Sequence, residues 1–404
     1  MKLNILFVDD DTNLLAGVRT MMHSMRKEWK CRYASSTADA LELVGKYPFD
    51  VVVSDMRMPG MDGSDFLKEV EKIQQGAVRI ILSGYSEMQA QLKSTGSAHQ
   101  FLSKPCSTDT IVNTIRRVAE LKDILTDDKI RKIVSELDSL PVIPELITKI
   151  REELERPDPD IAKVGRLVEQ DAGTSATLLK VVNSTFFGFY EKITSPSRAV
   201  VMLGTEVLKG LVLGVNLLRE LDVDSLNGYS VYKLWDHSLQ TGYFARAIAK
   251  CESTDRSFID CCFVSGLLHD VGKLVLITKM DSFYQLVLDA VAEQGGPVVK
   301  QEMRVLGATH AGVGAYLLGL WGFNEDVVKS VYSHHSFKDC GDKLTAPLIV
   351  HVADCLQHEI GLMDSDYVFY PLEIECLEKL NLQDRLEVWK EECAKAMEDK
   401  YERC

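Results

Sequence analysis

Acidic, hydroxyl and basic side chains follow four short apolar runs in the first quarter of the chain. They are Asp9, Asp10 and Asp11 after residues 5–8, Asp55 after 51–53, Ser83 after 79–82 and Lys104 after 100–102. If the runs are parallel strands, their carboxyl ends meet at one edge of a sheet, and these side chains share a pocket. Carboxylates in one pocket repel each other unless a cation joins them, and oxygen ligands with room for water suit Mg²⁺. A carboxylate beside Mg²⁺, with a hydroxyl and an ammonium nearby, can attack a phosphoryl group and form an acyl phosphate.

Each of these side chains also has an ordinary structural interpretation. The three aspartates 9–11 could serve only as an N-cap run for the next helix, and Asp55 only as a turn residue. Their joint placement at four successive strand ends favours the phosphoryl chemistry.

A second group of candidate residues lies where seven of the nine histidines fall, between positions 237 and 358. The adjacent His269 and Asp270 stand in an apolar stretch, and burying such a pair is costly unless it is ligated or hydrogen-bonded. The further members of the group are His237, His310, His334, His335 and Asp354. This mixture of imidazoles and carboxylates favours one or two ions of Mn²⁺, Fe²⁺, Ni²⁺ or Zn²⁺ over Mg²⁺. A helix bundle can hold such a site with ligands that project inward from facing helices.

The alternative for each of these residues taken singly is a satisfied core or surface side chain. The other histidines are predicted to be structural: His351 and His358 as surface residues, and His23 and His99 as surface or helix-end residues.

The elements that must position the first group alternate between strands and helices. Apolar, β-branched runs typical of buried parallel strands predict strands at 5–8, 51–53, 79–82 and 100–102. Helical spacing predicts helices at 13–25, 37–46 and 64–73, with N-caps at Asp11-Thr12 and Ser36-Thr37. Residues 1–123 are therefore predicted to form a doubly wound α/β domain with a parallel sheet, which carries its chemistry at the carboxyl ends of its strands.

The second group lies in a region with helical periods and no strand alternation. Residues 108–135 are predicted to run as a helix into a charged connector, 124–139, which has no Gly/Ser-rich segment and is therefore stiff. An all-helical domain is predicted at 140–360, followed by a charged helical extension at 361–404.

The composition disfavours several classes of protein. The 46 basic and 60 acidic side chains give a formal net charge of −14, which opposes binding of DNA or an anionic membrane through net charge. Apolar residues make up 46% of the chain, but no uninterrupted apolar run approaches the roughly 18 residues of a membrane span. The N-terminus lacks a signal-peptide profile, and ten scattered cysteines without a CxxC pair indicate reduced thiols. We therefore expect a cytoplasmic protein.

Over residues 1–123, the first group and its order along the chain resemble the receiver domain of two-component response regulators. The resemblance implies that Asp55 is the phosphoacceptor and that a sensor histidine kinase is the partner. It also implies that Asp9 and Asp10 hold Mg²⁺ together with Asp55 and the backbone carbonyl of Arg57.

The same resemblance implies a switch. Ser83 and Lys104 would contact the phosphoryl oxygens, and Phe101 stands where the family places its switching aromatic. New charge on Asp55 would draw Ser83 inward, and Phe101 would follow into the vacated space. Lys104-Pro105 is where the family commonly has a cis peptide bond.

The ordered set of histidines and aspartates resembles the His-Asp metal-dependent phosphohydrolase superfamily, whose metal activates a water that attacks a phosphoester. The resemblance implies that the seven candidate ligands hold one ion, or two if His310 and His334 or His335 complete a second site. Lys273 matches the lysine of the HDxGK form of the motif, which implies a contact with a substrate phosphate.

Residues 137–340 also resemble the HDOD output domain. The matching segments are Leu140–Pro144, Val168–Asp171, Leu178–Ser184 and Ser195–Gly204. Many members of that family have lost their metal ligands and act as non-enzymatic signalling modules, whereas the ligand set here is complete. The HD-GYP cyclic-di-GMP phosphodiesterases differ, because Ser336-Phe337-Lys338 replaces their acidic residue and no Gly-Tyr-Pro triplet follows.

Two functions remain open from the sequence. The first is a phosphorelay response regulator whose HDOD domain binds a downstream protein or a nucleotide ligand without turnover. The second is a receiver-gated metal-dependent phosphohydrolase that acts on a nucleotide or a cyclic dinucleotide. Direct DNA binding and membrane binding are not expected, since no basic recognition helix is present. The receiver would act through the stiff connector or, alternatively, by controlling homodimerisation.

Overall fold

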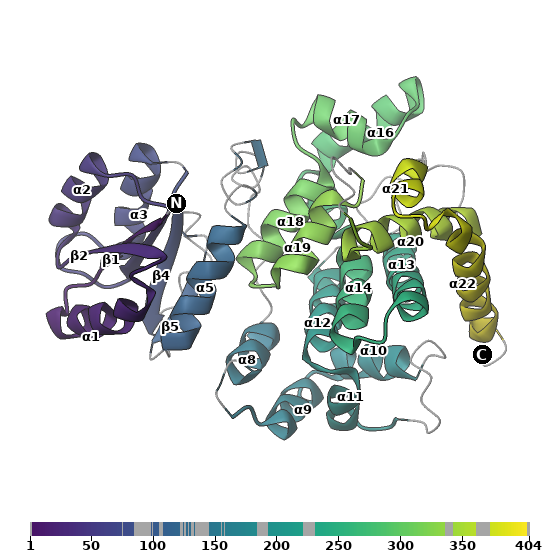
Figure 1. Ribbon diagram of the computed structural model, residues 1–404, viewed down its shortest axis with the longest axis horizontal. Helices are drawn as coiled ribbons and strands as arrows, with labels where there is room; N and C mark the ends of the chain where they lie inside the picture. The colour runs from purple at the N-terminus through teal and green to yellow at the C-terminus, as the bar shows by residue number, and fades with distance from the viewer. Residues whose placement is uncertain are drawn as a thin grey trace. The chain divides into compact units, whose positions relative to one another are not determined.

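The computed structural model describes most of the chain, and Figure 1 labels its helices and strands. The described residues are 2–74, 76–84, 98, 100–104, 108–121, 124, 127, 129–130, 133, 145–154, 156, 158–183, 193–220, 231–335, 342–360 and 372–401. Two compact units emerge, Met1–Val142 with Tyr316–Glu325, and Ile143–Ala315 with Asp326–Cys404, named here the α/β unit and the helical unit. Most of the predicted connector, 124–139, lies outside the described residues.

The α/β unit is built on a parallel sheet in the order β2-β1-β3-β4-β5 (Figure 1). The strands are β1 (Leu3–Val8), β2 (Trp29–Ala34), β3 (Val51–Asp55), β4 (Val78–Gly84) and β5 (Gln100–Lys104). Every neighbouring pair is parallel, so the carboxyl ends of the strands meet at one edge. The predicted doubly wound α/β fold is confirmed.

The apolar pattern does not predict strand β2. This strand lies at the edge of the sheet, where Trp29 and Ala34 are buried while Lys30 is exposed and Arg32 is half-buried. An edge strand has no need of the continuous apolar run that marks the central strands, so it escapes a search for such runs.

Helices cover both faces of this sheet. They are α1 (Thr12–Met22), the short η1 (His23–Met25), α2 (Thr37–Lys46), α3 (Gly63–Ile73) and α5 (Thr108–Glu120). Helices α2 and α3 bury Val44 and Phe66 in one cluster with Val52 of β3, while α1 lies on the other side in Figure 1. The predicted N-caps are confirmed, because Asp11 accepts hydrogen bonds from the backbone of α1 and Ser36 accepts one from that of α2.

The helical unit contains no strand among its described residues, as the sequence predicts. Its first helices are α8 (Glu145–Leu154), α9 (Ile161–Glu169), α10 (Ala172–Val182), α11 (Pro196–Leu203), α12 (Thr205–Glu220), α13 (Val231–Glu252) and α14 (Arg256–Leu268). The next are α15 (Val271–Lys279), α16 (Asp281–Gln294), α17 (Val298–Val305), α18 (His310–Leu320), α19 (Glu325–Ser333) and α20 (Ala346–Ile360). The last residues of α18 and the first of α19 fall in Tyr316–Glu325, which is grouped with the α/β unit. The last are α21 (Ile374–Lys379), η4 (Gln383–Arg385) and α22 (Leu386–Tyr401).

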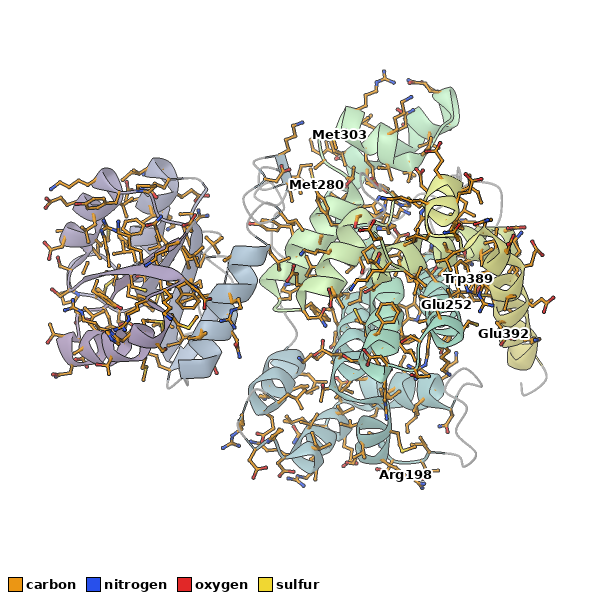
Figure 2. The ribbon with its side chains drawn as sticks, viewed as in Figure 1. Arg198, Glu252, Met280, Met303, Trp389 and Glu392 are labelled. Carbon is orange, nitrogen blue, oxygen red and sulfur yellow. The ribbon has the colours of Figure 1, made fainter. Side chains whose placement is uncertain are left out.

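Helices α13, α14 and α20 pack against one another at the centre of the helical unit. Helix α14 is buried continuously from Cys261 to Leu268, and α20 from Leu348 to Gln357. The C-terminal helix α22 packs on α13, where the indole of the buried Trp389 donates a hydrogen bond to Glu252 (2.8 Å; Figure 2). These central helices carry the candidate metal ligands.

Of two expectations from composition, only that of reduced thiols is corrected. One stretch, Arg256–Thr278, is long and apolar enough to span a membrane by length and composition, yet 94% of its apolar window is buried inside the protein, as in a core helix. Cys376 is disulfide-bonded, whereas Cys31, Cys261 and Cys393 have free thiols, so the described cysteines are not uniformly reduced.

Candidate functional site

The first candidate site lies at the carboxyl edge of the parallel sheet. Asp9 and Asp10 follow β1 and Asp55 ends β3, and one oxygen of each lies within 4.8 Å of the others. The ammonium of Lys104, at the end of β5, lies 2.8 Å from Asp9 Oδ2 and 2.5 Å from Asp55 Oδ1. The structure therefore brings together carboxylates and an ammonium that are up to 95 positions apart in sequence.

The charges at this edge act on one another. Burial raises the pKa of Asp55, and the Asp9 charge adds to this, while the Lys104 ammonium opposes it. Burial alone would lower the pKa of Lys104, but its hydrogen bonds to Asp55 and Asp9 outweigh burial and raise it. A carboxylate cluster held by one ammonium still carries surplus negative charge, and its oxygen ligands suit a hard divalent cation.

A glycine is required where α3 meets this edge. A Cβ at Gly63 would lie 2.0 Å from the backbone oxygen of Asp55, so only glycine allows α3 to begin here. The backbone of Gly63 donates to Met56, which closes the loop after β3. Arg57, whose carbonyl is a predicted Mg²⁺ ligand, lies in this loop two residues after Asp55.

The predicted switch residues are located by their backbones. Ser83 lies in β4, opposite Ser103 in the register with β5, and Phe101 of β5 lies opposite Ile81. Their side chains, together with Pro105, lie outside the described part of the structure.

The second candidate site lies in the helical unit and draws on several helices. His237 lies on α13, His269 and Asp270 join α14 to α15, and Asp354 lies on α20. His310 begins α18, and His334 and His335 directly follow α19. Although polar, all seven residues are buried, with exposures between 0% and 7%.

The seven residues form two adjoining clusters. In the three-ligand cluster, ligand atoms of His237, His269 and Asp354 lie within 4.8 Å of one another. In the four-ligand cluster, the same holds for Asp270, His310, His334 and His335.

Asp270 faces both clusters. Its Oδ1 lies 3.2 Å from His310 Nε2, and its Oδ2 lies 3.7 Å from His237 Nε2 and 3.5 Å from His269 Nε2. A carboxylate with one oxygen toward each cluster is placed to bridge two cations.

The imidazole rings are held so that Nε2 points into the clusters. Nδ1 of His269 donates to the Gly266 carbonyl, and Nδ1 of His334 donates to the Val331 carbonyl, each at 2.7 Å. Because a carbonyl oxygen only accepts, the network assigns the ring proton to Nδ1 and leaves a lone pair on Nε2. This is the tautomer that metal-ligating histidines adopt.

Several acceptor atoms in the clusters are left without a donor. Asp270 Oδ1, Asp354 Oδ1 and His334 Nε2 are buried and have no hydrogen-bond partner among the described residues. Nε2 of His237 also lies only 3.1 Å from Nε2 of His269. Facing lone pairs and unpaired carboxylate oxygens in a buried site are unfavourable unless cations occupy it, so the residues present fit a bound metal.

The electrostatics of the clusters also fit a cation. Burial raises the pKa of Asp270 and Asp354, but the neighbouring histidines outweigh burial and hold both values well below the usual range. Burial and the adjacent imidazoles hold the pKa of His334 and His335 well below its usual range, so these rings are neutral. Burial lowers the pKa of His269 and His310, but the carboxylates beside them outweigh burial and raise it, so the clusters favour positive charge. Their imidazole nitrogens and carboxylate oxygens form the mixed donor set of a first-row transition metal.

Lys273 lies beside the clusters, one helical turn after Asp270. Its ammonium donates to Asp270 Oδ2 at 2.8 Å, and its side chain is 10% exposed. A Cβ at Gly272 would lie 2.0 Å from the His310 carbonyl oxygen, so glycine is required for α15 and α18 to approach each other here.

Two histidines predicted to lie at the surface belong to this site instead. His351 is fully buried: its Nδ1 donates to the His334 carbonyl (2.8 Å), and its Nε2 accepts from the Glu373 backbone (3.0 Å). The His358 side chain is 20% exposed, and its ring centre lies 4.8 Å from that of His237. The surface prediction fails because the apolar character of α20 buries its polar residues as well. His23 is exposed at η1, and His99 lies outside the described residues.

Sequence reasoning missed two further residues. Glu302 accepts hydrogen bonds from His310, and Gln357 accepts one from His237. Glu302 stands in the polar stretch Lys300–Arg304, which is typical of a solvated helix face, so the sequence holds no signal for its burial. Gln357 lies three residues after Asp354, a weak helical-spacing signal at best.

Comparisons with known proteins agree with the two units. The model of the response regulator receiver domain matches residues 5–116, and that of the HDOD domain matches residues 140–337. Sporulation initiation phosphotransferase F of Bacillus subtilis is 30% identical over 126 residues, which are 30% of this chain and 98% of that protein. An uncharacterized protein of Treponema pallidum is 28% identical over 221 residues, which are 55% of this chain and 42% of that protein.

A crystal structure of an HDOD domain protein from Geobacter sulfurreducens has the fold of the helical unit. It superposes with a TM-score of 0.50 at 22% identity, covering 66% of this chain and 97% of that one. The chain spans less than half the length of the first curated relatives it matches, whereas it covers the short Bacillus protein almost completely.

Proposed function

This chain belongs to the response regulators in which a receiver domain precedes an HDOD domain, and we propose that phosphorylation of Asp55 controls a metal-holding HDOD output. The phosphodonor is a sensor histidine kinase, and the output is binding of a downstream protein or a nucleotide ligand in the cytoplasm. The proposed divisions are the receiver at 1–123, the connector at 124–139, the output domain at 140–360 and the extension at 361–404.

The role of Asp55 is supported by its position between a carboxylate pair and an ammonium. An Asp55 oxygen would attack the phosphorus of the kinase's phosphohistidine, whose P–N bond breaks as the histidine leaves. Asp9 and Asp10 would hold Mg²⁺ with Asp55 and the Arg57 carbonyl. When bound, Mg²⁺ neutralises the oxygens of the incoming phosphoryl group. Lys104, now 2.5 Å from Asp55 Oδ1, then pairs with the new phosphoryl oxygens. Ser83 and Phe101 transmit the change, as in the receiver switch.

One observation carries the metal proposal: Asp270 Oδ1, Asp354 Oδ1 and His334 Nε2 are buried, converge in the clusters and lack donors. The three-ligand cluster would hold one ion and the four-ligand cluster a second, with Asp270 between them. Mn²⁺, Fe²⁺, Ni²⁺ and Zn²⁺ suit this donor set better than Mg²⁺.

A second function, hydrolysis of a phosphoester in a nucleotide or cyclic dinucleotide, is favoured by Lys273. A cation beside the clusters and not fully buried can bind a substrate phosphate, which a purely structural metal site does not need. When bound, the metal supplies polarisation of the phosphoester and activation of water. In this function, Lys273 exchanges its Asp270 contact for the phosphate.

Elemental analysis of full-length protein purified without chelator tests the proposal. We expect between about one and two equivalents of transition metal in the unaltered protein. The matched variants are His269→Ala, which removes a ligand, and His23→Ala, which removes an exposed imidazole of the α/β unit that belongs to neither cluster. His269→Ala should lose metal, whereas His23→Ala should retain it.

A panel of nucleotide and cyclic-dinucleotide phosphoesters then separates the two functions. Metal without turnover supports the signalling output, and turnover lost in both His269→Ala and Lys273→Ala supports the hydrolase. Absence of stoichiometric metal from the unaltered protein would contradict the metal site and the hydrolase, and would leave a signalling output without metal.

A further inference from the structure

The acceptor that holds His310 is an ionised carboxylate. His310 Nδ1 donates to both Glu302 oxygens at 2.7 and 2.9 Å, and the His310 backbone donates to Glu302 Oε2 at 2.9 Å. Tyr284 of α16 donates its hydroxyl to Glu302 Oε1 at 2.8 Å. Glu302 lies on α17, the helix labelled at Met303 in Figure 2, and is 0% exposed. Such a fully hydrogen-bonded, buried carboxylate is a fixed negative charge behind the ring.

The acceptor that holds His237 is a neutral amide. His237 Nδ1 donates to Gln357 Oε1 at 2.5 Å, and the Gln357 amide in turn donates to Gln240 at 3.3 Å. Gln357 is 1% exposed, so this contact is as well protected from water as that of Glu302. The two rings differ in the charge of the partner and not in its burial.

This difference changes the ring as a ligand. A carboxylate that accepts Nδ1–H increases electron density at Nε2 and makes the ring a stronger metal ligand, whereas an amide does so much less. The Glu302 charge also attracts a cation bound at Nε2. His310 therefore favours metal more strongly than His237 does.

Lys273 adds to the inequality. Its ammonium contacts Asp270 Oδ2, which is the oxygen that faces His237 and His269, while Oδ1 faces His310 and has no donor. A cation in the three-ligand cluster would either share Oδ2 with this ammonium or have one protein ligand fewer than a cation in the four-ligand cluster. The partly exposed His358 also lies against His237, on the three-ligand side.

We infer that the two clusters differ in metal affinity, and this inference rests on the proposed metal site. Glu302 and Gln357 are the positioning residues that set the difference in affinity. The four-ligand cluster fills first and retains its ion. The three-ligand cluster binds weakly and exchanges its ion with solvent, so that its occupancy follows the available metal.

Metal titration of the full-length protein tests this inference. Metal-free protein is titrated with Mn²⁺ and then dialysed against chelators of increasing strength, and bound metal is measured by elemental analysis. We expect two steps in the unaltered protein, separated by at least about tenfold in affinity. His237→Ala should remove the weak step alone.

Reciprocal exchange of the two acceptors assigns the cause. Glu302→Gln keeps the shape and should weaken the tight step about 10–100-fold, and Gln357→Glu should strengthen the weak step. Tyr284→Phe is the control, because it removes a donor to Glu302 but leaves the charge, and it should keep both steps distinct. Circular dichroism and thermal unfolding verify that each variant is folded. If Glu302→Gln does not fold, the effect of Gln357→Glu on the weak step alone tests the role of the acceptor charge.

The outcomes separate the two levels of the account. No metal in the unaltered protein refutes the proposed metal site. Two binding steps of equal affinity would refute the difference in affinity and leave the metal site standing. The same holds if Glu302→Gln leaves the tight step unchanged and Gln357→Glu leaves the weak step unchanged.

Discussion

Asp55 ends strand β3, and an ammonium and two further carboxylates lie beside it. Its pKa is raised mainly by burial, so the carboxylate is less well solvated than an exposed one and is available to a cation and a phosphoryl group. Asp65, in contrast, pairs with Lys68 on the exposed face of α3. At the residue scale, this environment supports the proposal that Asp55 is the phosphoacceptor.

Substituting Asp55 with asparagine should abolish phosphoryl transfer to the protein. Asp55→Asn keeps the size of the side chain but removes the nucleophilic oxygen, so uptake from a small phosphodonor with Mg²⁺ should fall to background. Mass spectrometry of the intact protein measures the added phosphoryl group. Asp65→Asn is the matched control and should be phosphorylated normally; comparable uptake by Asp55→Asn would place the acceptor elsewhere.

The sequence predicts most residues of both sites but not their supporting contacts. Asp9, Asp10, Asp55 and Lys104 converge because a parallel sheet leaves no other place for the ends of its strands. Glu302 cannot be found in this way, because its burial depends on how α17 packs beside the start of α18. Such packing is a property of the tertiary structure and leaves no periodic signal in the sequence.

At the scale of elements, close helix approaches depend on particular glycines. Gly63 lies where α3 begins against Asp55, with no room for a Cβ, whereas Gly45 lies on α2 with nothing within 4 Å of the position of a Cβ. Both glycines lie in the α/β unit, but only Gly45 has room for a larger side chain.

Alanine at these two positions should therefore change stability in opposite directions. Gly63→Ala forces the loop after β3 to move and should lower the free energy of unfolding by about 1–3 kcal/mol. Gly45→Ala should raise it by up to about 0.5–1 kcal/mol through helix propensity. Urea unfolding measures both, and equal effects would show that the contact with the Asp55 carbonyl is not tight.

His351 joins α20, the end of α19 and the start of α21. It satisfies the His334 carbonyl on one side and the Glu373 backbone on the other. The sequence cannot predict this role, because the two partners stand 17 residues before it and 22 residues after it and share no motif.

Removing this imidazole should loosen α21. His351→Leu keeps a side chain of similar size but leaves the buried His334 carbonyl and the part-buried Glu373 N–H without this partner, at a cost of about 1–3 kcal/mol for the buried group. We expect a lower unfolding temperature and faster hydrogen exchange over residues 374–379, with His23→Gln as an unaffected control. Unchanged exchange there would mean that α21 is held by its other contacts.

At the scale of the whole molecule, the order of the two domains follows from where the predicted secondary structure changes along the chain. Alternating strands and helices give way to helices alone, and the structure has the same two classes of unit. How phosphorylation of the receiver changes the output domain is a question for experiment. The sequence from 108 to 135 has no Gly/Ser-rich segment, so we propose that it transmits the state of Asp55 as a stiff connector.

A coupling of about 1–3 kcal/mol between the two domains would change affinity at the output domain roughly 5–150-fold. The alternative is that the receiver controls homodimerisation and leaves each output domain unchanged. The two mechanisms differ in which peptides change their hydrogen exchange when Asp55 is phosphorylated.

Hydrogen exchange of the full-length protein, with and without beryllium fluoride and Mg²⁺ as a phosphoryl mimic on Asp55, tests the central claim most directly. Asp55→Asn under the same conditions is the control and should show no response. We expect protection to change within residues 5–116 and also in the helical unit, at a protein concentration where the oligomeric state is constant. Changes confined to residues 1–123, accompanied by a shift in oligomeric state, would contradict control of the HDOD domain by phosphorylation through the connector.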